Sequence, residues 1–95
     1  MGGYRPSLIV DYDDLADVLY LRLHQPQHTI GEINDEGIIF VMDDETDELV
    51  GVDILDFWER FVRQDGTLDD EALRRCLVAP FSEMIDEIRR GLLPA

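Results

Sequence analysis

Two short apolar runs separated by an acidic turn open this sequence, and they constrain the fold more than any other feature. Residues 8–10 and 18–23 have the composition of strands, and the segment between them contains Asp11, Asp13, Asp14 and Asp17. A connection this short joins antiparallel neighbours, because a parallel crossover needs about a dozen residues or more. The opening therefore predicts a hairpin from which a sheet grows.

Three further strands are expected at residues 29–34, 38–42 and 49–55. The tight turn before the second of these uses Gly37 to reach a positive φ. Gly51, inside the last run, indicates a bulge or a close approach of another group. Residues 18–23 and 38–42 are apolar on both faces, so we expect both strands to be covered on both sides.

After residue 55 the pattern becomes helical. Asp56 followed by Glu59 has the spacing of a capping box. A second helix is expected after Thr67 or Asp69, and a third after Pro80, ending near Gly91. The sequence predicts an α+β fold: an antiparallel sheet of four to five strands, ordered as a meander, followed by two to three C-terminal helices packed on one face.

The 95 residues are expected to form one domain, with a loose leader at residues 1–7, the sheet at 8–55 and the helical segment at 56–93. A domain this short is only marginally stable alone, which favours a homo-oligomer, most simply a dimer. The single cysteine, Cys76, fits a reducing compartment, so we expect a cytoplasmic protein. On its apolar helical face it is expected to be a core residue.

Charge restricts the classes of partner. Twenty-two acids face eight basic residues, all arginine, and give a net charge of −14. Such a field repels phosphate backbones and anionic membranes, so we expect no nucleic acid and no membrane partner. A basic protein would be attracted, although solubility alone would also account for the charge. No motif calls for a cofactor.

Four carboxylates are candidates for catalysis if two of them converge: Asp13, Asp17, Glu32 and Asp53. Glu32 and Asp53 lie within predicted strands, where an inward carboxylate needs a partner. Arg22, also within a strand, can supply it, and a structural ion pair is the simpler interpretation.

The turn at residues 43–48 offers Asp43, Asp44 and Asp47 as ligands for a hard cation. It is not an EF-hand, because Glu48 and Ile54 stand where that loop needs Gly and Glu. A solvated turn is the simpler interpretation. His24 and His28 have a zinc-like spacing, but Pro26 between them argues against a helix.

Four aromatic residues are either core or part of an association surface: Tyr20, Phe57, Trp58 and Phe61. Of these, Tyr20, Trp58 and Phe61 are the candidates for binding. Strands that are apolar on both faces need more cover than about 35 helical residues easily provide, which favours an association surface.

Residues 8–56 resemble a family of small prokaryotic proteins, domain of unknown function 2283. The resemblance rests on Tyr12-Asp13, the run at residues 16–21, Glu32-Ile33 and the strand at residues 51–55. The family's characteristic polar positions map to Asp13, Asp17, Tyr20, Glu32 and Asp53. The resemblance implies a small domain of strands and turns, and it assigns no activity.

The sequence therefore favours a non-enzymatic protein-interaction or self-association module. The alternative is a small carboxylate-dependent or metal-assisted enzyme. Geometry distinguishes them, because the enzyme requires at least two of the four carboxylates to converge in a concave site.

Overall fold

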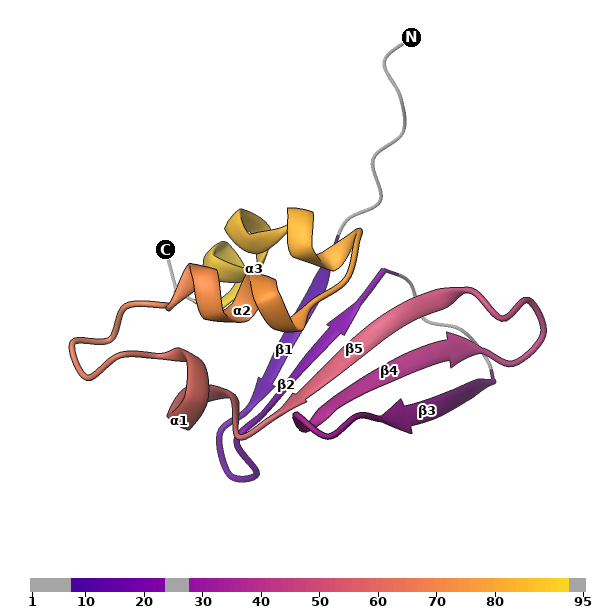
Figure 1. The fold of residues 1–95 in the computed structure, drawn as a ribbon, viewed down its shortest axis with the longest axis horizontal. Coiled ribbons are helices and arrows are strands. Elements are labelled where there is room, and N and C mark those ends of the chain that lie inside the picture. Colours follow the sequence, from indigo (N-terminus) through magenta and orange to yellow (C-terminus); the bar gives the residue numbers. More distant parts are fainter. Residues whose placement is uncertain (1–7, 24–27, 93–95) are drawn as a thin grey trace, which may run out of the picture.

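A five-stranded antiparallel sheet forms the first half of the structure (Figure 1). The computed structural model describes residues 8–23 and 28–92. The leader proposed for residues 1–7 lies outside these ranges, as does His24. The strands are β1 (Ile9–Asp13), β2 (Val18–Arg22), β3 (Thr29–Ile33), β4 (Ile38–Asp43) and β5 (Leu49–Leu55).

The strand order is β1-β2-β5-β4-β3, with every neighbouring pair antiparallel. The sheet thus combines the predicted hairpin β1–β2 with a three-stranded unit β3–β4–β5. These two units meet where β2 pairs with β5, Tyr20 lying opposite Asp53. The strands β1 and β3 become the two edges of the sheet.

Three α-helices and a short 3₁₀ helix follow within residues 56–92, and the predicted α+β class is confirmed. They are α1 (Phe57–Phe61), α2 (Asp70–Cys76), η1 (Phe81–Glu83) and α3 (Ile85–Leu92). Asp69 caps α2 by accepting a hydrogen bond from the N–H of Ala72 at 3.3 Å. No helix in the described ranges is long and apolar enough to cross a membrane.

The third helix runs to Leu92, near its predicted end, and Gly91 lies within α3 rather than after its last residue. A Cβ built on Gly91 would lie 2.6 Å from Cβ of Val10 on β1. Any larger residue would therefore push the helix away from the strand. The absence of a side chain serves close helix–strand packing here, rather than a positive φ at a C-cap.

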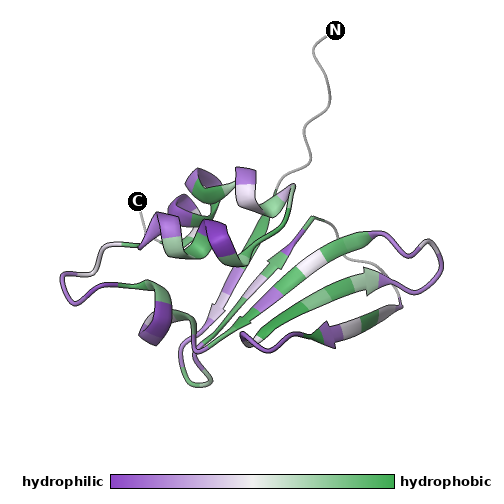
Figure 2. Cartoon of the chain, in the orientation of Figure 1, coloured by the Kyte–Doolittle hydropathy of each residue, from purple (hydrophilic) through white to green (hydrophobic). Residues whose placement is uncertain are grey.

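The core lies between one face of the sheet and the helices. Alternate residues of the central strands, including Leu19, Leu21 and Ile54, are fully buried against Phe57 and Leu73. Figure 2 shows this apolar character continuing along β4 and β5 beyond the helices. The helices lie over the β1–β2 side of the sheet, and β3 lies far from them (Figure 1).

The expectation that β2 and β4 would be covered on both faces is wrong in one respect: the helices pack on a single face. On the other face Val18 and Val41 are still buried, and the side chain of Arg22 lies across Gly51. A Cβ on Gly51 would meet Arg22 Cδ at 2.6 Å. The predicted close approach at Gly51 is confirmed, and the β4–β5 register shifts beside it, between Val41 and Met42.

Candidate interaction surface

Asp13 has a local structural role. Its Oδ1 accepts hydrogen bonds from the N–H groups of Leu15 and Ala16, at 3.0 and 3.2 Å. This side chain therefore holds the turn that joins β1 to β2, because an aspartate readily bonds backbone groups two and three residues ahead.

Asp17 caps a helix that lies 41 residues further along the chain. Its Oδ1 accepts from the N–H of Trp58 at 2.8 Å, and its Oδ2 accepts from the N–H of Glu59 at 3.3 Å. The hydroxyl of Tyr12 also donates to Oδ1, at 2.7 Å. Asp56, expected to be the cap, makes no side-chain cap bond and has φ 53°.

The contact between Tyr12 and Asp17 accompanies pKa shifts in opposite directions for the two side chains. Burial, and then the hydrogen bond to Asp17, raises the pKa of Tyr12 to about 12. Partial burial alone would raise the pKa of Asp17, but the N–H of Trp58, the Tyr12 hydroxyl and the N–H of Glu59 together hold it below its usual value. An aspartate kept ionised in this way suits a fixed cap better than a proton donor or acceptor.

Arg22 was the predicted partner of Glu32 or Asp53, and it pairs with Asp53. The nitrogen Nη1 of Arg22 lies 2.6 Å from Oδ1 of Asp53, and the same nitrogen donates to the carbonyl of Leu21 at 2.9 Å. The two side chains are 20% and 14% exposed. This pair covers the sheet face opposite the helices, where Arg22 also crosses Gly51.

Glu32 is exposed on β3, and the four candidate carboxylates do not share a site. In the strand register Glu32 lies on the helix-facing side of the sheet, opposite Phe40, whereas Asp53 lies on the other side. Asp13 and Asp17 flank the β1–β2 turn. Three of the four are committed to a turn, a helix cap and an ion pair, so these four candidates do not form a carboxylate pair with one another.

The acidic turn after β4 is held by hydrogen bonds between a side chain of the turn and its own backbone N–H groups. Oδ1 of Asp43 accepts from the N–H groups of Glu45 and Thr46, at 2.8 and 3.3 Å, while Asp47 adopts φ 59°. Asp44 is exposed. In the described ranges, three potential ligand atoms come within 4.8 Å of one another at Asp17, Asp56 and Glu59, not in this turn. Both oxygens of Asp17 are already occupied there by backbone N–H groups.

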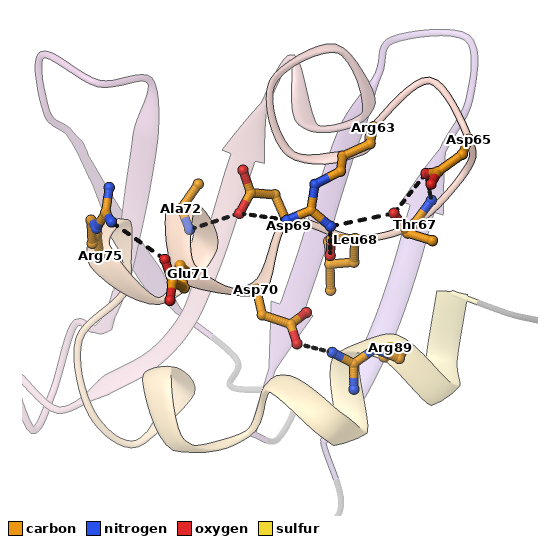
Figure 3. Close-up of polar contacts among 10 residues, drawn as sticks. All are labelled: Arg63, Asp65, Thr67, Leu68, Asp69, Asp70, Glu71, Ala72, Arg75 and Arg89. Atoms are coloured by element: carbon orange, nitrogen blue, oxygen red, sulfur yellow. Dashed lines mark hydrogen bonds and ion pairs between the residues drawn. The ribbon is translucent and has the colours of Figure 1, made fainter.

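An apolar cavity of about 290 Å³ lies between α1, the loop before α2, and α3; Trp58, Leu68 and Leu92 are among the residues that line it. Its charged residue, Arg89, bonds Asp70 at the start of α2 (Figure 3) and also Asp86 at 2.9 Å. These carboxylates raise the pKa of Arg89 further. The guanidinium thus ties α3 to α2, and the cavity wall gives no free ionic group.

The aromatic candidates separate into core and surface. Phe61 is 3% exposed and belongs to the core, so it does not contribute to a surface. Tyr20 is half-buried on β2. Trp58 is 45% exposed, and its ring lies 6.0 Å from that of Tyr12.

Cys76 is partly buried. Its burial, and then its interaction with the nearby Glu36, raise the pKa of its thiol, which disfavours the reactive thiolate.

The most exposed apolar strand is β3, which the sequence did not single out. All five of its residues are exposed, with Ile30 at 50% and Ile33 at 62%. As the last strand in the sheet order, it presents one side of its backbone to no other described strand. An edge of this kind can accept an additional strand through main-chain hydrogen bonds. We call residues 29–33 of β3 the open edge.

Comparison with known proteins gives one match. A family model described as a protein of unknown function, DUF2283, matches residues 9–57, which run from the start of β1 to the first residue of α1. Neither the curated proteins nor the solved structures yielded a match. The sheet with its turns is therefore the part shared with the family, and α2 and α3 follow it. This chain belongs to the DUF2283 family.

Proposed function

We propose that this protein is a non-enzymatic interaction module that associates with itself through its sheet. The observation that carries the proposal is the open edge: a five-residue strand exposed along its whole length, with two isoleucines more than a third exposed. Natural edge strands are usually blunted by charged side chains, especially lysine, by proline or by a bulge. Residues 29–33 contain neither lysine nor proline, their one charged residue is Glu32, and the bulge of this sheet lies between β4 and β5.

The direct test is sedimentation velocity of the full chain over about a hundredfold range of concentration. Self-association predicts a reversible rise from the 11.0 kDa monomer to the dimer. Since each copy carries a net charge of −14, the copies repel, and added salt should strengthen the dimer by screening that repulsion. A monomer at every concentration and salt level would refute self-association.

A second candidate partner is a basic protein, and the net charge of −14 is the observation in its favour. Opposite charges attract, so salt should weaken this complex, the reverse of its effect on the dimer. Pull-down from the native host at low and high salt separates the two. A basic protein captured in stoichiometric amount at low salt and lost at high salt would support this second partner.

The enzyme alternative has less support, because Asp13, Asp17 and Asp53 each have a structural partner and Glu32 lies apart from them. We place the protein in the cytoplasm, where its lone cysteine would remain reduced.

A further inference from the structure

We propose that two copies pair antiparallel through the open edge, about a two-fold axis at Gly31, so that two five-stranded sheets become one. This inference rests on the proposed self-association and names its surface, partner and register.

The hydrogen bonds of β3 to β4 show which backbone groups point outward. The N–H of Asn34 donates to the carbonyl of Ile38 at 2.9 Å, and the N–H of Asp44 donates to the carbonyl of His28 at 3.1 Å. Bonded pairs alternate along an antiparallel ladder, so the even-numbered residues of β3 face β4. The N–H and C=O groups of Thr29, Gly31 and Ile33 therefore point away from the sheet.

Outward groups at three alternate positions limit the register. Pairing Gly31 with Gly31 of the second copy brings Thr29 opposite Ile33 and uses all three positions of both strands. A shift by two residues leaves outward groups unpaired, and in one direction it places Glu32 opposite Glu32, which is unfavourable. In the Gly31-centred register Glu32 instead lies opposite Ile30.

The side chains fit this register. On one sheet face Thr29 and Ile33 form two symmetric pairs of β-branched residues, a favourable cross-strand combination. On the other face Ile30, 50% exposed, meets the aliphatic part of Glu32. Gly31 at the axis adds no side chain between the two strands.

The opposite edge is less suited to the same pairing. Asp11 and Asp13 alternate along β1, and α3 packs on this strand at the close contact of Gly91 with Val10. Two copies joined there would bring acids together. Asymmetry between the edges favours a closed dimer over an open fibre, since β3 pairing consumes the open edge of both copies.

Cysteine cross-linking tests the register in a Cys76→Ala background. The Cα atoms of Thr29 and Ile33 in the two copies would be about 5.5 Å apart, within disulfide range. Two copies of the same residue would be about 13 Å apart along the strands, beyond that range. A mixture of Thr29→Cys and Ile33→Cys chains should therefore cross-link under mild oxidation, whereas neither chain should cross-link alone.

A charge substitution tests the surface without cysteine. Ile33→Lys should weaken the dimer by about tenfold or more, because each dimer loses two cross-strand pairs. Leu15→Lys is the matched control: Leu15 is 97% exposed in the β1–β2 turn, and the change in net charge is identical. This control should leave the dimer unchanged or slightly tighter. Thermal melts by circular dichroism confirm that both variants are folded.

The outcomes separate the pairing from the function. If Ile33→Lys forms a normal dimer and the mixture of Thr29→Cys and Ile33→Cys chains gives no cross-link, the open-edge pairing is overturned and self-association is kept. A chain that stays monomeric would overturn both. A dimer lost in Ile33→Lys, kept in Leu15→Lys and cross-linked only in the mixture supports the pairing.

Discussion

One half of the sheet is covered by helices and the other half is bare, although both are built from similar apolar strands. In the covered half, Leu19, Leu21 and Ile54 are completely buried beneath the helices. In the bare half, β3 is exposed at every residue. The intermediate strand β4 buries Ile38 beneath the helices and leaves Phe40 and Met42 half-buried.

The difference shows that strand composition does not decide burial in this fold. Isoleucine at position 54 and isoleucine at position 30 both lie on the helix-facing side, one fully buried and the other half exposed. What differs is the reach of the helices, which ends before β3 (Figure 1). The bare half is thus where a partner can replace the missing layer or the missing neighbour.

The largest expected effect comes from truncating Ile54 in the covered half, with Ile30 in the bare half as the comparison. Ile54→Ala should reduce the free energy of unfolding by about 2–5 kcal/mol, because it opens a cavity in the core. Ile30→Ala should reduce it by less than about 1 kcal/mol in the monomer. Urea unfolding at low protein concentration measures both, and equal losses would contradict the division into covered and bare halves.

Breaking the ion pair on the uncovered face should have the next largest effect. Asp53→Ala leaves the mostly buried Arg22 without its carboxylate and should cost about 2–3 kcal/mol. Glu32→Ala, which removes an exposed acid from the bare half, is the matched control and should change stability by less than about 0.5 kcal/mol. Replacing the pair together, as Arg22→Met with Asp53→Leu, should recover much of the loss when both are compared by urea unfolding.

Removing the distant helix cap should cost less. Asp17→Ala deprives α1 of its cap and should reduce stability by about 1–2 kcal/mol. Asp14→Ala, an exposed acid in the same turn, should be nearly neutral. Asp17→Asn should fall between them, since an amide oxygen can still accept the backbone bonds. A Trp58 fluorescence melt reports the change close to α1.

Acid should erase the advantage of Asp17 over asparagine. Its folded pKa lies below the ordinary value of 3.8, so the charged form stabilises the fold above about pH 4, and this contribution is lost as the pH falls through the folded pKa. The stability difference between the wild type and Asp17→Asn should therefore be constant near neutrality and vanish in strong acid. A difference that grows on acidification would contradict the cap geometry.

The sequence predicted those features that local residue patterns and simple pairing rules encode. All five strands were expected, because Asp-rich turns and Gly37 separate their apolar runs. Arg22 was expected to pair with Glu32 or Asp53, because a carboxylate within a strand needs a partner, and the structure pairs it with Asp53. The role of Gly51 followed from its place inside a strand.

Long-range packing decided what the sequence could not predict. Asp56 and Glu59 have capping-box spacing, yet it is the carboxylate of Asp17 that accepts the hydrogen bonds from the first N–H groups of α1. A glycine at position 91 is typical of a helix end, yet here the close contact with Val10 leaves no room for a side chain. The open edge depends on the strand order and on where the helices stop, which no local pattern encodes, so Ile30 and Ile33 were not recognised as surface residues.

The capping of α1 by Asp17 also couples this helix to the first hairpin. A helix of five residues is too short to persist alone in water, so α1 needs its cap and its packing to exist. Asp17 is synthesised about forty residues before α1, so the capping carboxylate is already present when the helix segment leaves the ribosome. The stability of α1 thus depends on a β1–β2 turn that holds Asp17 in place, and damage to that turn would also loosen the helix.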